Sequence, residues 1–436
     1  MKQRTLATAV AVAMLGTGAA QAAGIEFWYG NTGKPEEAIQ AACAAFNKSQ
    51  DKDKVTCVGQ GSYEVAMQKA IAAFRAGNAP ALLQVFDAGT LDIMLSDAAI
   101  PLSEALPDVK WDDYISGAKS YYQASDGRLF SQPYNASTLV FYTNKTLLEK
   151  AGVAKTPQTW EEVVDAARKL KASGVACPYG TNAEPWIIFE QFAARHGEPI
   201  ATKNNGYGGL DAEYVFNKGL IAKHMQDLKA WRDEGLVRLD VDTKAGKFVS
   251  AFTSGECAMM EGSSGSYTTA LAGLGGRYEL TVSLAPMYAG HERHNTLVGG
   301  GSIWLMKGHS DEENAASKAF LDFLRQPVQQ LALTEATGYV PVTQSALDSV
   351  RASGKQDQPA FKAAALGIES LNEPATPASR GIRLGFYTQF RAGWTEEVQK
   401  AFNGEQTMQQ ALDNAKTRGD ELLKRFAATY SGAKLP

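Results

Sequence analysis

The side chains that most often perform catalysis are few in this sequence, and they match no familiar catalytic pattern. The chain has five histidines. His291 and His294, in the run HERH, lack the HExxH spacing that places two imidazoles on one helical face. The run EGSSGS (261–266) is not a GxSxG nucleophile elbow, because Ser266 stands where that pattern requires glycine. No GxxxxGK[ST] phosphate loop is present. These absences favour ligand binding over catalysis.

One stretch rich in serine and glycine could bind an anion. The run MMEGSSGSYTTA (259–270) precedes TTALAGL, which has the composition of a helix. If Ser263 lies at the start of that helix, its hydroxyl and the first-turn amides would face a negatively charged group. The alternative is a flexible surface loop. The choice between these two interpretations depends on the rest of the chain.

Composition and charge describe an ordinary globular protein of more than one domain. The 436 residues suffice for two domains, with 44% hydrophobic and 21% charged residues. The net charge is −4 and no basic run is present, so no nucleic-acid partner is expected. No CxxC or histidine spacing indicates a metal site, and no motif indicates a cofactor. A monomer is the default expectation.

The N-terminus has the pattern of a secretory signal peptide. Lys2 and Arg4 precede an apolar run (6–15), and AQA (20–22) provides a cleavage site with small residues. The apolar run is too short to span a bilayer, and no cysteine follows the cleavage site for a lipid anchor. We therefore expect a signal peptide at 1–22 and a periplasmic protein whose net charge falls from −4 to −6.

The four cysteines are expected to pair in an oxidising compartment. Cys43 lies on the same face of a predicted helix as Ile39 and Phe46, and Cys57 lies in the following strand segment KVTCVG. These two faces should pack together in a β-α-β unit, which predicts a Cys43–Cys57 disulfide. Cys177–Cys257 is the second predicted pair. The alternative for each pair is two buried free thiols.

Strand and helix patterns alternate in the first part of the chain. GIEFWYG (24–30), KVTCVG (54–59) and ALLQVFD (81–87) are apolar strand segments. A helix opened by Pro35 separates the first two, and a helix capped by Ser62 separates the last two. This alternation favours a parallel sheet covered by helices.

The pattern changes beyond SQPYNASTLVFYTNK (131–145) and later returns. A helix with a Thr159–Glu162 capping box follows, and a helix-rich region extends to about Arg238. FVSAFTSGECAMM (248–260) then has the character of a strand. A sheet that passes to a second region and comes back predicts two lobes joined by several crossings, with a ligand cleft between them.

Several ordered blocks of sequence resemble one known family. They are AAFRAGNAPALLQVFDAGT (72–90), SQPYNASTLVFYTNK, FTSGECAMM (252–260) with GSSGS (262–266), LVGGGSIWLMKG (297–308), ATGYVPVT (336–343) and GIRLGFYTQFR (381–391). The chain resembles the periplasmic glycerol-3-phosphate-binding proteins of ABC importers, within the extracellular solute-binding proteins of family 1. The resemblance covers nearly the whole chain after residue 22.

This resemblance implies a fold and a division into lobes. The fold is the α/β, two-lobed periplasmic-binding-protein fold of type II. Each lobe is a mostly parallel sheet flanked by helices, and hinge crossings join the two. The implied first lobe is 23–135 plus 263–328, and the implied second lobe is 136–262 plus 329–436.

The resemblance also implies the residues that contact the ligand, which are Tyr63, Asp87, Ser137, Ser263, Gly300, Tyr339 and Arg391. A guanidinium such as Arg391 presents a planar fork to two phosphate oxygens. The phenols and serines add O–H donors, and glycine lets the backbone approach closely. A carboxylate at the end of its strand accepts hydrogen bonds from glycerol hydroxyls. Arg383 is a second arginine nearby, for which a structural ion pair is an equal alternative.

Two positions depart from the family pattern. Asp87 stands where the glycerol-phosphate binders have glutamate, and Ala183 aligns with a family tryptophan. Trp186 matches a different tryptophan of the family, three residues further on. Both departures remove side-chain volume and are expected to widen the pocket.

The ligand hypothesis follows from these departures. We expect binding of a glycerophosphodiester such as glycerophosphocholine, and/or sn-glycerol 3-phosphate, with delivery to an ABC permease. An oligosaccharide-binding protein is the alternative, since Trp186 and the tyrosines could stack on sugar rings. A secreted phosphodiester hydrolase is disfavoured by the scattered histidines.

Overall fold

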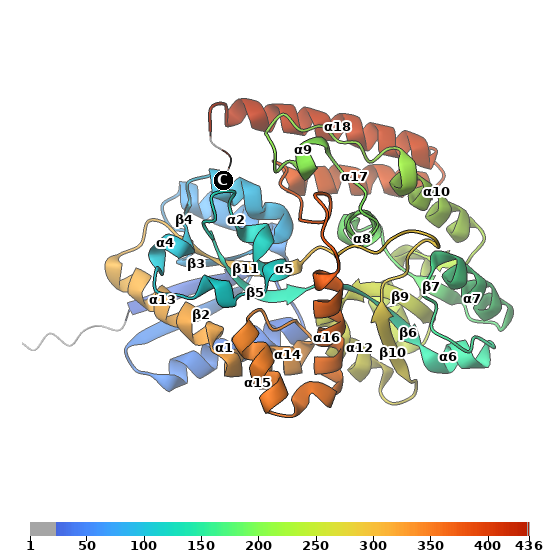
Figure 1. Ribbon diagram of the computed structural model, residues 1–436, viewed down its shortest axis with the longest axis horizontal. Helices are drawn as coiled ribbons and strands as arrows, with labels where there is room; N and C mark the ends of the chain where they lie inside the picture. The colour runs from blue at the N-terminus through green and yellow to red at the C-terminus, as the bar shows by residue number, and fades with distance from the viewer. Residues whose placement is uncertain (1–22, 434, 436) are drawn as a thin grey trace, which may run out of the picture.

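The computed structural model describes residues 23–433 and 435, which form two lobes that each contain one β-sheet (Figure 1). The expected signal peptide at 1–22 lies outside the described residues. Within the described part of the chain, no helix is long and apolar enough to cross a membrane. The two-lobed α/β fold expected from the sequence is confirmed.

The first sheet has the strand order β2-β1-β3-β11-β4, and β5 also pairs with β11. Its strands are β1 (Ala23–Tyr29), β2 (Asp53–Gly59), β3 (Leu82–Phe86), β4 (Ala99–Ile100), β5 (Gln132–Ser137) and β11 (Gly299–Met306). β1 runs parallel to β2 and β3, whereas β11 runs antiparallel to β3, β4 and β5. Phe27, Leu83 and Trp304 are fully buried, as expected for strands covered on both faces.

The second sheet has the order β10-β6-β9-β7-β8. Its strands are β6 (Leu139–Asn144), β7 (Cys177–Gly180), β8 (Val237–Arg238), β9 (Cys257–Ser263) and β10 (Leu280–Leu284). β7 runs parallel to β8 and β9, whereas β6 runs antiparallel to β9 and β10.

Both sheets are therefore mixed, and the expectation of mostly parallel sheets is wrong. The reason lies in the crossings. β5 runs toward the hinge and ends at Ser137, whereas β11 enters the same sheet from the hinge at Gly299, so the two are antiparallel. In the second sheet β6 leaves the hinge at Leu139, while β9 approaches it and ends at Ser263. Strands that enter and leave a lobe through one hinge must run in opposite directions.

Helices cover both sheets (Figure 1). On the side of the first sheet lie α1 (Lys34–Ser49), α2 (Tyr63–Arg75), α3 (Thr90–Leu95), α4 (Leu102–Ala105), α5 (Ser116–Lys119), α13 (Asp311–Arg325), α14 (Pro327–Thr337) and α15 (Gln344–Ala352). On the side of the second lie α6 (Lys145–Lys150), α7 (Trp160–Ala172), α8 (Gln191–Arg195), α10 (Gly219–Asp233), α11 (Phe248–Ser254), α12 (Tyr267–Leu274), α17 (Tyr387–Phe402) and α18 (Met408–Thr429). α16 (Pro359–Asn372) stands between the two groups.

Several segments, α12 and α15 among them, lie with the lobe opposite to the one that the sequence assigned, and β10 and α14 show this most directly. Residues 280–284 were expected in the first lobe, but they form β10 on the edge of the second sheet beside β6. Residues 329–337 were expected in the second lobe, but they belong to α14, which packs against α1. The order of the sequence blocks did not show that the chain stays in the second lobe from β9 to β10, or that it stays in the first lobe from β11 to α14. The other boundaries stay a proposal.

Local signals in the sequence agree with several elements. The Thr159–Glu162 capping box opens α7, and Ser62 accepts a hydrogen bond from the amide of Val65 at the start of α2. Residues 248–254, expected to be strand-like, form α11 instead. In α11 the apolar side chains of Phe248, Ala251 and Phe252 recur at helical spacing and are buried together.

Both predicted disulfides are present. Cys43 on α1 is bonded to Cys57 on β2. Cys177 and Cys257 are direct neighbours in the parallel pair β7–β9, and their sulfur atoms are bonded. Pairing of all four cysteines agrees with an oxidising compartment.

The serine-glycine stretch lies buried at the hinge, and the surface-loop interpretation is wrong. The chain stays with the second lobe here, because β9 before the stretch and β10 after it belong to the same sheet. Ser264 is fully buried. Its amide donates to the carbonyl of Thr138 over 2.8 Å, and its hydroxyl accepts from the Thr138 amide over 3.3 Å. Thr138 is the single residue between β5 and β6. The serine-glycine stretch is thus bonded at the hinge to the crossing between β5 and β6.

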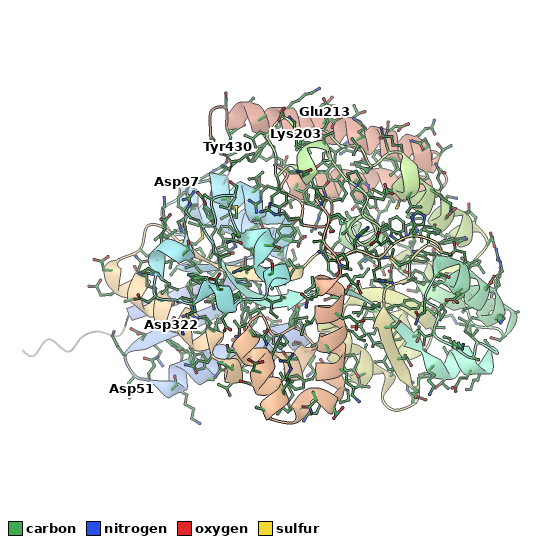
Figure 2. The ribbon with its side chains drawn as sticks, viewed as in Figure 1. Asp51, Asp97, Lys203, Glu213, Asp322 and Tyr430 are labelled. Atoms are coloured by element: carbon green, nitrogen blue, oxygen red, sulfur yellow. A yellow bond between two sulfur atoms is a disulfide. The ribbon has the colours of Figure 1, made fainter. Side chains whose placement is uncertain are left out.

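The lobes also meet outside the hinge. The carboxylate of Asp92, on α3, accepts a hydrogen bond over 3.1 Å from the amide of Phe386, directly before α17. Tyr430, at the end of α18, lies above the first lobe in Figure 2 and shares a cavity with residues of α2. The C-terminal helices therefore contact both lobes.

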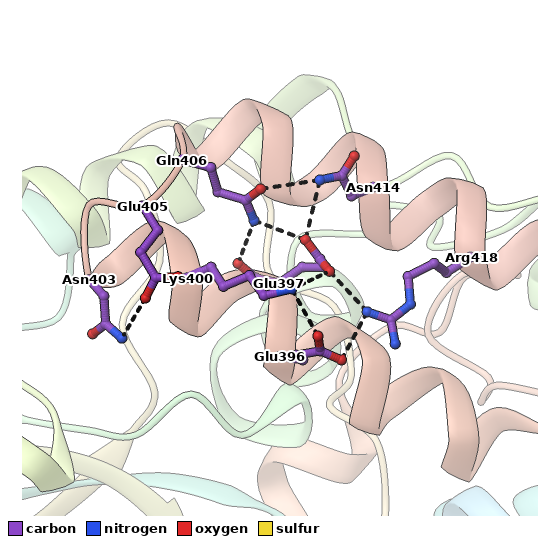
Figure 3. A network of polar contacts seen from close by, with 8 residues as sticks. All are labelled: Glu396, Glu397, Lys400, Asn403, Glu405, Gln406, Asn414 and Arg418. Carbon is purple, nitrogen blue, oxygen red and sulfur yellow. Dashed lines mark hydrogen bonds and ion pairs between the residues drawn. The ribbon is translucent and has the colours of Figure 1, made fainter.

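A buried carboxylate ties α17 to α18. Glu397 on α17 accepts hydrogen bonds from Lys400 over 3.1 Å, Gln406 over 2.9 Å, Asn414 over 3.2 Å and Arg418 over 2.9 Å (Figure 3). Burial alone would raise the pKa of Glu397, but these donors lower it to about 2. The network fixes α17, the helix that holds the site arginine described below.

The lowered pKa of Glu397 predicts a pH-dependent contribution to stability. Because its folded-state pKa lies below the ordinary value of 4.5, the contribution is complete above that value and is lost as the pH falls toward 2. Glu397→Gln should lower the free energy of unfolding at pH 7 by about 1–3 kcal/mol. It should also flatten the loss of stability between pH 5 and 2.5. Urea unfolding tests this, with Glu405→Gln as the control, and parallel pH profiles for wild type and Glu397→Gln would refute it.

Candidate functional site

All seven residues implied by the resemblance line one cavity between the lobes, with a volume of about 320 Å³. They are Tyr63, Asp87, Ser137, Ser263, Gly300, Tyr339 and Arg391. The cavity lies at the hinge, where β5, β9 and β11 meet. Larger hollows of about 700 and 1000 Å³ exist on the first lobe, but none of the seven lines them.

Three buried amides hold the two phenols. Asn31 Nδ2 donates to the hydroxyl oxygens of Tyr63 and Tyr339 over 3.0 and 3.2 Å, and Asn135 Nδ2 donates to Tyr63 over 2.8 Å. Gln84 Nε2 donates to Asn31 Oδ1 over 2.7 Å and to Asn135 Oδ1 over 2.9 Å. Because each phenol oxygen already accepts from an amide, its own O–H remains available as a donor to a ligand.

The phenols stay protonated across the physiological range. Burial raises the pKa of Tyr63 well above its usual value and raises the pKa of Tyr339. The ring of Tyr63 also stacks on Phe86 with centroids 5.4 Å apart. Both phenols are thus neutral donors held in fixed positions.

Sequence reasoning missed Asn31, Gln84 and Asn135, although one signal was present. Gln84 is the only polar side chain within β3 (Leu82–Phe86), and it is fully buried. A polar residue in such a strand requires partners, which predicts a hydrogen-bond network. Asn31 and Asn135 gave no comparable signal, because Asn31 follows β1 and Asn135 lies in the run QPYNAS, where other polar residues surround it.

The two serines and Gly300 lie at the crossings. Ser263 Oγ accepts from the amide of Gly265 over 3.2 Å, so its O–H can donate elsewhere. Gly300 has φ +83°, and a Cβ there would lie 2.0 Å from the carbonyl oxygen of Asn135. Glycine is therefore required by the protein's own backbone at this position. The absence of a Cβ would also let a ligand approach the backbone closely.

The expected first-turn amides are mostly occupied. The amides of Ser264 and Gly265 are used at the crossing, and the amide of Tyr267 donates to the carbonyl of Ser264. A short 3₁₀ turn, Ser264–Ser266, stands where the helix start was expected. The contribution of this stretch to the cavity is chiefly the Ser263 hydroxyl.

Arg391 connects the lobes through two carboxylates. Its Nη2 donates to Asp87 Oδ2, which follows β3 in the first sheet, over 2.6 Å. Its Nε and Nη2 donate to the two oxygens of Glu190, in the second lobe, over 2.7 and 2.5 Å. Tyr387 donates to Glu190 over 2.8 Å. Glu190 is fully buried, and sequence reasoning missed it.

The expected use of Arg391 as a two-pronged phosphate clamp is therefore wrong in this structure. Glu190 occupies the Nε–Nη2 edge of the guanidinium, and only Nη1 has no partner among the described residues. Burial raises the pKa of Asp87 to about 6, against the opposing effect of Arg391 and with a further increase from Glu190. One guanidinium thus balances two carboxylates.

The second lobe contributes one wall of the cavity through a π-helical turn, Trp186–Glu190. Its first residues, Trp186 and Ile187, line the cavity together with Glu184, while its last residue holds Arg391. Ala183 is buried and is not among the lining residues. The expected widening of the pocket relative to a tryptophan at this position therefore stays a prediction.

Arg383 has a structural role rather than a place in the cavity. It is 2% exposed, and its Nη2 donates to the carbonyls of Tyr121 and Gln123 over 2.9 and 3.0 Å. Its guanidinium also lies over the ring of Tyr207. Among residues 23–433 and 435, no cluster of His, Cys, Asp or Glu side chains could hold a metal ion.

Comparison with known proteins identifies close relatives in sequence. A model of bacterial extracellular solute-binding proteins matches residues 41–363. The sn-glycerol-3-phosphate-binding periplasmic protein UgpB of Pectobacterium atrosepticum is 36% identical, over 97% of this chain and 96% of that protein. The protein of the same name from Escherichia coli K12 is also 36% identical, over 96% of this chain and 97% of that protein.

Solved structures share the fold at lower identity. UgpB from Mycobacterium tuberculosis, in complex with glycerophosphocholine, has a TM-score of 0.78 at 19% identity and covers 93% of this chain and 99% of its own. The GacH receptor of Streptomyces glaucescens has a TM-score of 0.77 at 18% identity and covers 92% and 99%. With the family model across most of its length and relatives aligned from end to end, the chain belongs to the bacterial extracellular solute-binding proteins.

Proposed function

We propose that the protein binds a glycerophosphodiester such as glycerophosphocholine, and/or sn-glycerol 3-phosphate, in the interlobe cavity and delivers it to the permease of an ABC importer. The observation that supports this most is the convergence of a guanidinium, four hydroxyls and a carboxylate on one cavity at the hinge. The curated relatives that align over nearly the whole chain are named for sn-glycerol 3-phosphate.

The donors around the cavity suit a phosphoryl group. Nη1 of Arg391 and the hydroxyls of Ser137, Ser263, Tyr63 and Tyr339 are available. Hydrogen bonds from a charged donor to phosphate oxygens are about twice as strong as neutral ones, so Arg391 should orient the group. The phenols and serines complete the coordination without adding positive charge.

The carboxylate of Asp87 suits the glycerol portion. Phosphate oxygens offer no protons to a carboxylate, whereas glycerol hydroxyls do. Asp87 is 3% exposed and lies at the carboxyl end of β3, where ligands bind in open α/β sheets. If ligand hydroxyls replaced Arg391 as the hydrogen-bond partners of Asp87, the guanidinium would become free to bind the phosphate.

An oligosaccharide is the weaker candidate. Ligand cavities in proteins range from about 300 to 1,000 Å³, and this one, at about 320 Å³, is at the small end. Among the aromatic residues that line it, Tyr63 is already stacked on Phe86. The ring surface available to stack on a series of sugar rings is reduced accordingly.

The proposal includes release of an unaltered ligand. Relatives of this chain are solute-binding proteins, and no histidine lines the cavity. Closure of the lobes on the ligand would present one closed form to the permease. We propose a periplasmic monomer, secreted through the signal peptide at 1–22, that needs no cofactor and has no nucleic-acid partner. Recovery of intact glycerophosphocholine after long incubation tests the absence of hydrolysis.

Removal of the guanidinium should weaken the binding of phosphate ligands selectively. Arg391→Ala should reduce the affinity for glycerophosphocholine about 10- to 100-fold, since a hydrogen bond to a charged group contributes about 1.5–3 kcal/mol. Calorimetry measures this, with Arg380→Ala as an exposed arginine control. Tyr339→Phe, which keeps the ring, should cost less, about 10-fold. Unchanged affinity in a folded Arg391→Ala protein would contradict the proposal.

If Asp87 serves the ligand, it should lower the stability of the free protein. Its folded-state pKa, about 6, exceeds the ordinary 3.8, so the folded state gains protons between these values and stability falls as the pH rises through 6. Asp87→Asn should therefore raise the free energy of unfolding at pH 7.5 by about 1–3 kcal/mol. The gain should vanish near pH 4, while ligand affinity falls. Thermal and urea unfolding at both pH values test this, and a variant that is less stable at pH 7.5 would contradict it.

A further inference from the structure

Two carboxylates from one short segment of the first lobe contact two points on one helix of the second lobe. Asp87 begins a 3₁₀ turn (Asp87–Gly89), and Asp92 lies in α3, which follows this turn directly. Asp87 Oδ2 accepts from Arg391 Nη2 over 2.6 Å, and Asp92 Oδ1 accepts from the amide of Phe386 over 3.1 Å. Phe386 directly precedes α17, and Arg391 lies on that helix. The lobes therefore contact each other at two points on this pair of segments.

The spacing of the two contacts is the same on both sides. Asp87 and Asp92 are five positions apart in the sequence, and so are Phe386 and Arg391. The hydroxyl of Thr90 donates to the carbonyl of Asp87 over 2.7 Å, which fixes the turn between the two carboxylates. Because both segments are ordered and short, the position of one contact constrains the position of the other.

The helix that carries Arg391 has no N-terminal cap from its own side chains. In α7, α13 and α18, the residue before the helix and the third helical residue each bond the other's backbone amide. Before α17 stands Phe386, which has no polar side chain, and the first turn contains no acidic residue. The amide of Phe386 is one of the donors that the start of a helix leaves unpaired. Asp92 pairs it from the opposite lobe, as the glutamate of a capping box does within one helix.

The backbone of Phe386 is in a conformation that depends on its surroundings. Its φ is +50°, in the left-handed region that a bulky residue rarely adopts. Such a conformation persists only where neighbouring contacts hold it. The ring packs against Phe426 of α18 with centroids 5.0 Å apart, and Asp92 binds the amide. The first lobe thus supplies one of the contacts that hold the start of the helix of Arg391.

A second cavity between the lobes surrounds this contact. Its volume is about 530 Å³, and residues of α2 and α3 line it together with Phe386 and the first turn of α17. The charged residues in its lining are Glu64, Arg75 and Asp92. Burial raises the pKa of Asp92 from 3.8 to about 6, although the amide of Phe386 opposes this. Stability therefore falls as the pH rises through this range, and the ionised carboxylate is kept at a cost.

We propose that Asp92 is a positioning residue for the interlobe site, because it caps the helix of Arg391 from the opposite lobe and completes that helix only when the lobes are close together. The cap is lost as α3 and α17 separate, so closure and the placement of the guanidinium are linked. An interaction made only in the closed form shifts the equilibrium toward that form. Its effect on ligand binding rests on the proposed function, whereas its effect on closure does not.

The distance between two spin labels tests the effect on closure. All four cysteines are in disulfides, so Asp51→Cys in the first lobe and Glu213→Cys in the second provide exposed labelling positions (Figure 2). Double electron–electron resonance then gives the distance distribution, without ligand and along a titration with glycerophosphocholine. Asp92→Ala should shift the distribution toward longer distances. Asp92→Asn keeps an acceptor oxygen and should restore most of the wild-type distribution. Asp108→Ala, which removes an exposed carboxylate of the first lobe, is the control.

Calorimetry with glycerophosphocholine and sn-glycerol 3-phosphate measures the effect on binding. Asp92→Ala should weaken both ligands by about 3- to 10-fold, the equivalent of one hydrogen bond, and Asp92→Asn by less. Thermal unfolding at pH 7.5 distinguishes this role from a purely structural one. Because the ionised carboxylate lowers stability, neither variant should unfold at a lower temperature than wild type. A purely structural contact would instead lose stability and affinity together.

Two results would overturn the proposal. One is the same distance distribution in wild type and Asp92→Ala, and the other is an unfolding temperature that falls together with the affinity. If neither ligand binds to the folded wild-type protein, the proposed function fails, and the ligand-free distances still test the cap. Longer distances in Asp92→Ala, with recovery in Asp92→Asn and no change in Asp108→Ala, support the proposal.

Discussion

The ion pairs of Arg391 are the interaction on which the arrangement of this molecule depends. One guanidinium in the second lobe meets Glu190 of its own lobe and Asp87 of the other. It defines how far apart the lobes stand and which edge of the guanidinium a ligand can reach. The network around Glu397 holds the helix of Arg391, and the amides of Gln84, Asn31 and Asn135 fix the phenols opposite it. Contacts remote from the cavity therefore determine the positions of its donors.

The hinge allows these two sets of groups to approach each other. The crossing at Thr138 and the turn at Ser264 are bonded to each other and buried. Strands run toward and away from this hinge in each sheet, which makes both sheets mixed. Ser137, Ser263 and Gly300 lie at the ends of these strands. Ligand groups held there would lie directly beside the hinge.

Sequence reasoning succeeded where side-chain chemistry is local and failed where it depends on the approach of the lobes. The capping box at Thr159, the apolar face with Cys43 and the Cys43–Cys57 disulfide follow from short-range patterns, whereas Cys177–Cys257 was predicted as the pair that remained. The convergence of Tyr63 and Arg391 came from resemblance, because no local pattern connects residues so far apart. Glu190 was missed because nothing in the sequence shows that a glutamate in a helical segment is buried. Residues 280–284 were misplaced because nothing local distinguishes which sheet an edge strand joins.

A crystal structure of the mature protein with glycerophosphocholine tests the central claim most directly. We predict the phosphate within hydrogen-bond distance of Arg391 Nη1 and the Ser263 and Tyr339 hydroxyls, with the glycerol on Asp87. Electron density for the ligand outside this cavity, or a phosphate that contacts neither Arg391 nor Ser263, would contradict the account.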